Sequence, residues 1–372
     1  MASPVYFADL RARRFKDNKI SKIGRLFDKA GLAGLVKPNG LTAVKVHFGE
    51  IGNDTFISPV LVRRIVDKVR EAGGKPFLTD TNTLYSGGRK NSADHIATAI
   101  SHGFSFATMN APIIIADGLK STHCAHIPIN GKWFETVKIA GDIAASHAMI
   151  AVSHFKGHEL AGFGGAIKNL AMGCATAQGK KEQHSARFFV DEETCIGCGN
   201  CQEVCPEGAA TLVEKDGGQK AAIDKEICIG CGECLAVCPE KSIDLDWRTD
   251  IVPFMERMTE YALGAFRSVS GRVGFVNLLV NITPDCDCIP WSDAPIVPDV
   301  GILVSMDPVA IDQAGWDLVN QQAGNPQSLL SKNLAPGEAK IPGLWSHTQA
   351  DLQLSYGEQI GLGSRKYELI KI

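Results

Sequence analysis

The fold is decided by a stretch that reads CIGCGNCQEVCP over residues 195–206 and returns as CIGCGECLAVCP over residues 228–239. Both runs have the spacing C-x2-C-x2-C-x3-C-P. Three thiolates on such a loop can hold three irons of a cubane, and in two-cluster proteins the fourth cysteine of each run binds the other cluster. The sequence therefore predicts two [4Fe-4S] clusters. The predicted ligand sets are Cys195, Cys198, Cys201 and Cys238 for one cluster, and Cys228, Cys231, Cys234 and Cys205 for the other.

Other uses of cysteine compete with this interpretation. Structural zinc favours two separated C-x2-C pairs, and a disulfide framework needs an oxidising compartment. Eight cysteines in two identical runs, each ending in Cys-Pro, fit neither pattern. Crossed ligation would also join the two half-repeats, so that about sixty residues could fold without a large apolar core.

Composition limits the remaining possibilities. The chain has 372 residues and a formal net charge of -3, with acidic and basic residues intermixed, so no single-sign field favours nucleic acid or an anionic membrane. The longest apolar stretches are far shorter than a bilayer-spanning helix. Arg13-Arg14 resembles part of a twin-arginine signal, but polar residues replace the hydrophobic segment that should follow. We expect a cytoplasmic protein whose partner is a redox protein or a small-molecule substrate.

The segments on both sides of the cysteine runs alternate β-branched stretches with amphipathic ones, which is typical of an α/β sheet with crossover helices. We expect a host α/β domain with a mixed or parallel sheet, formed by residues 1–187 and 248–372. A small α+β, ferredoxin-like insert would occupy residues 188–247. Strands are expected at 42–48, 76–79, 111–116, 148–153, 272–282, 300–305 and 367–372, and helices at 59–72, 92–102, 253–268 and 308–320, the last with Asp307 as N-cap.

Several polar residues follow predicted strands of the host domain. In α/β sheets, ligands bind at the carboxyl ends of the strands. Each of these residues also has an ordinary structural explanation, such as a turn or a backbone hydrogen bond. Their recurrence on different strands predicts a second site. The residues are His47, Asp80, His154, Cys286 and Cys288.

This second site could bind a metal ion. His154 and His158 would share a face if their loop were helical, and Cys286 and Cys288 could direct two thiolates at one ion. The predicted site for an additional zinc or iron ion is therefore His154, His158, Cys286 and Cys288, with His47 nearby. Alternatively the two cysteines are buried thiols or a dithiol. Asp285 and Asp287 are expected to raise the thiol pKa values.

A glycine-rich loop, residues 157–169, runs into an apolar segment. Its backbone amides and Lys168 could bind a carboxylate or phosphate, although it matches no nucleotide-binding spacing and could be a flexible connection. Cys174 and the group His123-Cys124-Ala125-His126 could bind metal on paper. Ordinary packing is the simpler expectation for both.

Two family resemblances add to this interpretation. The cysteine runs resemble those of two-cluster bacterial ferredoxins. The stretches SHFKGHELAGFGGAIKNLAMGC, NITPDCDC and PDVGILVSMDPVAIDQAGWDLV resemble the domain-of-unknown-function 362 family of iron-sulfur proteins, in which a ferredoxin module is often inserted. The second resemblance implies the same architecture but no settled reaction. It further implies one site that contains His154, Gly165, Lys168, Asn169, Cys286, Cys288 and Asp312, of which Lys168 and Asp312 are the catalytic candidates.

Four functions are compatible with these features. The first is a redox enzyme, in which the clusters relay single electrons to a substrate or metal in the host domain. The others are an electron carrier with a docking surface, a non-redox metal enzyme that activates water, and an iron-sulfur handling protein that uses Cys286 and Cys288. We expect the redox function because the two cluster motifs are the strongest signal.

Overall fold

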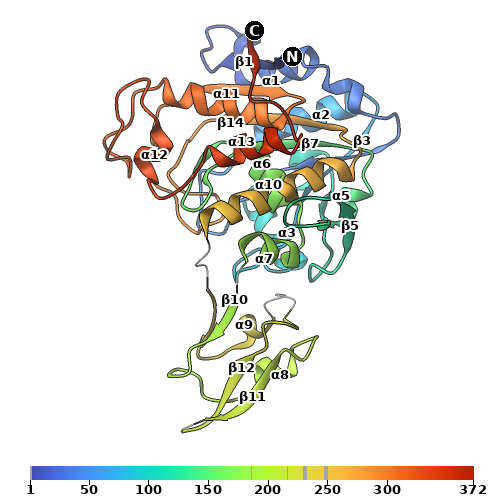
Figure 1. The fold of residues 1–372 in the computed structure, drawn as a ribbon. Coiled ribbons are helices and arrows are strands. Elements are labelled where there is room, and N and C mark those ends of the chain that lie inside the picture. The colour runs from blue at the N-terminus through green and yellow to red at the C-terminus, as the bar shows by residue number, and fades with distance from the viewer. Residues whose placement is uncertain (1, 186, 216, 229–232, 247–249) are drawn as a thin grey trace.

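The computed structural model describes residues 2–185, 187–215, 217–228, 233–246 and 250–372. Its centre is an eight-stranded sheet with the strand order β16-β1-β15-β14-β7-β2-β3-β4 (Figure 1). Five neighbouring pairs are parallel, and the two pairs that include β15 are antiparallel. This mixed sheet with its helices confirms the predicted α/β class. The strands are β1 (Ser3–Asp9), β2 (Leu41–Lys45), β3 (Lys75–Asp80), β4 (Ile113–Ile115), β7 (Ala148–His154), β14 (Val273–Leu279), β15 (Gly301–Ser305) and β16 (Tyr367–Lys371).

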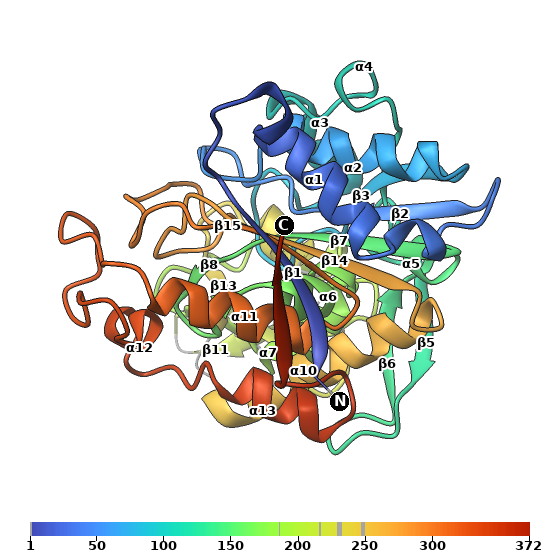
Figure 2. The same ribbon diagram turned by 90° about the horizontal axis from the view of Figure 1, so that it is seen from above.

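Helices cover both faces of this sheet, because successive residues of a strand point to opposite sides. Ala43 and Met149 belong to one apolar core, whereas their neighbours Val44 and Ile150 belong to the other. The first core packs against α6, α10 and α11, and the second against α1 and α2 (Figure 2). These helices are α1 (Lys19–Lys29), α2 (Pro59–Glu71), α6 (Ala166–Cys174), α10 (Ile251–Ser268) and α11 (Pro308–Asn320).

Most predicted elements of the host segments form close to the expected bounds. The expected N-cap of α11 is present, since the carboxylate of Asp307 accepts hydrogen bonds from Val309 N and Ala310 N. The strand β1 was not expected. The smaller elements are η1 (Phe15–Asp17), η2 (Leu32–Leu35), α3 (Ser92–Ser101), α4 (Phe106–Met109), β5 (Cys124–Pro128), β6 (Thr136–Ala140), α5 (Gly141–Ala144), β8 (Lys156–His158), β9 (Gly162–Gly164), α7 (Ala177–His184), α12 (Lys340–Leu344) and α13 (Leu352–Gln359).

The cysteine-rich segment forms its own small sheets. β10 pairs with β13 and β11 with β12, all antiparallel, and an apolar cluster that includes Phe188 and Ile243 lies within the segment (Figure 1). The large sheet is built from strands before and after this segment. Its elements are β10 (Arg187–Val190), α8 (Asn200–Glu203), β11 (Ala210–Lys215), β12 (Gly218–Ile223), α9 (Glu233–Val237) and β13 (Ile243–Asp246).

None of the helices in the described ranges is both long and apolar enough to cross a membrane.

The N-terminus of α6 is capped from another helix. Ala166 N and Ile167 N donate to the two carboxylate oxygens of Asp312 on α11, at 2.7 and 2.9 Å, and Asn277 Nδ2 donates to the same carboxylate at 2.6 Å. Gly165 permits this contact, since a Cβ at that position would lie 2.3 Å from Asp312 Oδ1. Burial raises the pKa of Asp312 to about 6, although the three donors oppose the rise.

Replacement of this cap should destabilise the host domain. We expect Asp312→Asn to lower the free energy of unfolding at pH 8 by about 2 kcal/mol, because the amide group opposes one of the donors and leaves it unpaired. Urea unfolding followed by tryptophan fluorescence measures this change. Asp317→Asn, on the same helix but more exposed, is the matched control. Equal stability of the two variants would contradict the capping role.

Candidate functional site

Parallel strands of the sheet end at one edge, and a cavity of about 870 Å³ lies there. His47 and Asp80 line it from the ends of β2 and β3, as the sequence predicts. The cavity is completed by residues of β8, α6, α7 and the loop after β14. Its other polar lining residues include Glu50, Thr81, Tyr85, Arg89, His158, Glu159, Lys168, Lys180, His184, Cys286 and Cys288.

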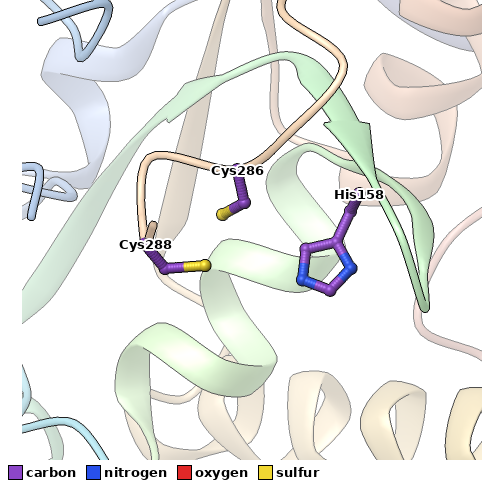
Figure 3. Close-up of side chains that lie close together, drawn as sticks. All are labelled: His158, Cys286 and Cys288. Atoms are coloured by element: carbon purple, nitrogen blue, oxygen red, sulfur yellow. The ribbon is translucent and has the colours of Figure 1, made fainter. Parts of the chain in front are cut away.

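Three predicted residues meet at this cavity. The nearest donor atoms of His158, Cys286 and Cys288 all lie within 4.8 Å of one another. Figure 3 shows the ring of His158 with an edge turned toward both sulfur atoms. His158 and Cys286 are buried, and Cys288 is half-buried. Lys168 Nζ, from α6, lies 3.6 Å from Cys286 Sγ.

His154 does not join this group. Its Nδ1 lies 2.9 Å from Asp287 Oδ1, and its Nε2 lies 2.8 Å from the carbonyl oxygen of Val280. The segment is extended rather than helical, since β7 ends at His154 and β8 follows, so His154 and His158 do not share a helix face. Both ring nitrogens of His154 are engaged within the protein.

Asp287 fixes the position of the loop that carries both cysteines. Its carboxylate contacts His154 and lies 3.3 Å from Lys156 Nζ. Burial raises the pKa of Asp287, but His154 and Lys156 outweigh burial and the pKa is lowered overall. The residue between the two cysteines is therefore a buried carboxylate with its own partners.

The loop after β14 also approaches the β8–β9 hairpin closely. Gly157 N donates to Thr283 O at 2.8 Å, and a Cβ on Gly157 would lie 2.1 Å from Pro284 O. Trp345 Nε1 donates to Pro284 O at 3.0 Å from the other side. These contacts hold Cys286 and His158 next to each other.

The electrostatic environment separates the two cysteines. A hydrogen bond from Cys288 lowers the pKa of Cys286 well below its usual value against the effect of burial, and the charges of Lys168 and Lys156 lower it further. The same hydrogen bond and burial raise the pKa of Cys288. The expectation that the neighbouring aspartates would raise both thiol pKa values is wrong for Cys286, because the charges of nearby lysines outweigh that of Asp287.

His47 lies in a separate network on the same cavity. Its Nδ1 accepts from Gly49 N at 3.0 Å, and its Nε2 lies 2.9 Å from Arg89 Nη1. Arg89 also forms an ion pair with Glu50 at 3.1 Å and contacts the hydroxyl of Tyr85. Burial, followed by the charge of Arg89, lowers the pKa of His47 well below its usual value, so His47 is neutral.

A second buried ion pair supports the cavity floor. Lys45 Nζ lies 3.0 Å from Asp80 Oδ1 and donates to Asn169 Oδ1 at 2.7 Å. Asn169 in turn donates to Ser153 Oγ at 3.0 Å. Asn169 therefore links α6 to β2 and β7, rather than lining the cavity.

The helix α7 contributes Lys180 and His184 to the cavity. Lys180 Nζ donates to Thr81 Oγ1, Asn82 O and Ala175 O, at 2.6 to 2.8 Å. Burial lowers the pKa of Lys180 to about 8. The next residue on this helix, Lys181, points elsewhere and donates to the carbonyl oxygen of Cys228.

The cysteine-rich segment contains a second, much smaller cavity. Cys195, Cys198, Cys201 and Cys238 line it together. Several backbone amides point at cysteine sulfurs. Ala209 N donates to Cys205 Sγ at 3.1 Å, Ser242 N to Cys238 Sγ at 3.2 Å and Ala221 N to Cys195 Sγ at 3.4 Å. Cys231 lies outside the described residues.

Other candidates are structural in this geometry. The anion cradle predicted at the start of α6 is occupied by Asp312, which does not line the cavity. Cys174 is buried with its sulfur 3.9 Å from Met149 Sδ. Cys124 is half-buried on β5 and His123 contacts Asp142 at 3.3 Å, so neither belongs to the cavity.

Sequence reasoning missed several residues at the site. Arg89, Glu50 and Tyr85 come from loops after β2 and β3, and Lys156 lies two residues from each histidine in His154-x-Lys156-x-His158. The placement of Glu50 and Arg89 after strand ends is the signal that could have found them. Lys180 carries no such signal.

The fold and the cavity define a mixed α/β protein with a ligand-sized site at the carboxyl edge of its sheet. The description "Domain of unknown function (DUF362)" matches residues 42–317, well over half of the chain. The protein therefore belongs to the DUF362 family.

Curated relatives match only short stretches. The chain is 71% identical over 28 residues, 8% of its length, to an iron-sulfur subunit of CoB--CoM heterodisulfide reductase from Methanopyrus kandleri, and spans 4% of that protein. It is 47% identical over 47 residues, 13% of its length, to a second such iron-sulfur protein of the same organism and the same reductase name, and spans 7% of it.

Two solved structures are similar at 10% sequence identity. The lactate racemase apoprotein of Thermoanaerobacterium thermosaccharolyticum gives a TM-score of 0.40, over 74% of this chain and 50% of that one. A protein from Thermotoga maritima gives 0.39, over 77% and 55% of the two chains.

The contact between Lys168 and Cys286 gives a test of thiol activation. We expect Lys168→Met to slow alkylation of Cys286 by iodoacetamide at pH 7 by about tenfold, the effect of one pKa unit on the thiolate fraction. Peptide mass spectrometry under anaerobic conditions measures the rate. Lys168→Arg should retain most of it, and Lys29→Met, on the exposed side of α1, should not change it. An unchanged rate in Lys168→Met would refute this role.

Proposed function

We propose that this protein is an iron-sulfur redox protein that holds two [4Fe-4S] clusters in its ferredoxin-like segment and delivers single electrons to the cavity of the host domain. The observation that carries the proposal is the joint position of Leu84 and α7 between the two regions. Leu84 lines the cavity and also packs in the apolar cluster of the cysteine-rich segment.

The cysteine geometry supports the first cluster. Four cysteines from the two runs line one small cavity, in the crossed combination that the spacing predicts. Amide hydrogen bonds to Cys195, Cys205 and Cys238 suit thiolate ligands, because such donors stabilise negative charge on sulfur. These cysteines fit a [4Fe-4S] cluster, which would supply one-electron chemistry when bound.

The contacts of α7 support a route between the regions. Lys181 donates to the carbonyl oxygen of Cys228, while Lys180 and His184 on the same helix line the cavity. The cluster assigned to Cys228, Cys231, Cys234 and Cys205 would therefore be the one nearer the host site. The short matches to proteins named as iron-sulfur components of a reductase are in keeping with this assignment.

An external low-potential donor, either a partner protein or a small molecule, would reduce the clusters. Exposed thiolate clusters favour a reducing compartment, so we place the protein in the cytoplasm. The cavity of about 870 Å³ with its buried ion pairs favours a host site over a plain electron carrier. Burial of Cys286 weighs against its transient exposure in an iron-sulfur handling protein.

The additional zinc or iron ion predicted from the sequence would bind at His158, Cys286 and Cys288, and the mutual distances allow it. The hydrogen bonds of His158 do not fit. A ligating histidine donates its other ring N–H to an acceptor. Here Nδ1 of His158 instead accepts from Leu160 N and Ala161 N, both at 3.1 Å. We therefore assign no resident ion to this group.

Metal analysis tests the cluster assignment. Anaerobically purified protein should contain about eight irons and about eight sulfides per chain, and dithionite should bleach its visible absorption reversibly. Cys238→Ser should lose about half of the iron, and Cys205→Ser should lose the other half, because each cysteine closes a different cluster. The Cys124→Ser variant, whose cysteine lies on β5, is the control and should match the wild type.

Electron paramagnetic resonance of the reduced variants identifies which cluster is lost. A wild type with fewer than about four irons, or clusters that dithionite does not reduce, would overturn the proposed function.

A further inference from the structure

Cys286 has an unusual set of neighbours. Lys168 Nζ lies 3.6 Å from its sulfur, and the thiol of Cys288 donates to the same sulfur. His158 completes the group on the third side (Figure 3). Each of these neighbours has a proton to offer, so the group is built around a thiolate at Cys286 and a thiol at Cys288.

The hydrogen bonds of His158 define which of its nitrogens carries a proton. Burial, together with the charges of Lys168 and Lys156, lowers the pKa of His158 well below its usual value, so the ring is neutral. Nδ1 accepts two backbone N–H groups and therefore has no proton. The single ring proton lies on Nε2, which faces the sulfurs as a donor and not as a metal ligand.

The two cysteines are close enough to form a disulfide. Residues two apart have Cα atoms at most about 7 Å apart, and disulfides need about 4.4 to 6.8 Å. Both cysteines are free thiols in this structure. Their side chains line the cavity, so a small molecule in the cavity can reach the sulfurs.

We propose that Cys286 and Cys288 form a redox-active dithiol/disulfide pair, which accepts two electrons from the cysteine-rich segment and passes them to a small disulfide in the cavity. The proposal rests on the proposed function, since it names the electron acceptor of the host site. Lys168 and His158 position and stabilise the Cys286 thiolate.

The reaction balances as a disulfide reduction. The Cys286 thiolate attacks one sulfur of the bound disulfide, whose S–S bond breaks, and the first thiol leaves with a proton. The Cys288 sulfur then attacks Cys286 and releases the second thiol, which forms the Cys286–Cys288 disulfide. Two electrons, supplied singly through the clusters by a low-potential donor, and two protons from solvent restore the pair. Lys168 and His158 are the nearest proton donors.

A reductive titration counts these electrons. Protein oxidised with hydroxyethyl disulfide is freed of that reagent and titrated anaerobically with dithionite. We expect the wild type to take up about four electrons per chain and Cys286→Ser/Cys288→Ser about two, because a disulfide accepts two electrons and each cluster one. Cys124→Ser is the control and should behave as the wild type.

Mass spectrometry gives a second readout that needs no variant. In oxidised wild type, the peptide with both cysteines should be about 2 Da lighter and resist alkylation, and dithionite should reverse both effects. Equal electron uptake in wild type and double variant, or a zinc or iron ion beyond the clusters that only the double variant loses, would overturn the inference. Absence of the clusters themselves would instead overturn the proposed function.

Discussion

The parallel pairing of β7 with β14 connects the two halves of the host domain across the cysteine-rich segment. Val152 lies opposite Val276 and His154 opposite Leu278, in strands that are buried along their whole length. This register brings the loop with both cavity cysteines next to the β8–β9 hairpin with His158. A shift by one residue would turn each strand's side chains to the other face, so the register is strongly specified.

Charge compensation then shapes the site. Three buried carboxylates, Asp80, Asp287 and Glu50, each have a basic partner at 3.0 to 3.3 Å. Breaking such a pair would leave an uncompensated buried charge, which is strongly destabilising. Because Asp287 is already neutralised by His154 and Lys156, Lys168 is left to act on Cys286. The site thus combines a fixed loop with one activated sulfur.

Local sequence patterns predicted much of the fold and part of the site. The Asp307 cap, the strand ends at His47 and Asp80, and the spacing of the cysteine runs depend on neighbours in the chain. The partners of His154 and Asp312 do not. His154 meets an aspartate 133 residues away, and Asp312 caps a helix 146 residues away. One sequence does not report such pairings, so His154 looked like a ligand and Asp312 like a catalyst.

The central claim is that electrons pass from the clusters to the cavity. Its most direct test is to reduce the protein anaerobically, remove the reductant, add hydroxyethyl disulfide and follow the return of the visible absorption. The account predicts reoxidation at least about tenfold faster in the wild type than in the variant that lacks both cavity cysteines, because direct reaction with the clusters bypasses the thiolate. Equal rates, with full cluster content in both proteins, would contradict it.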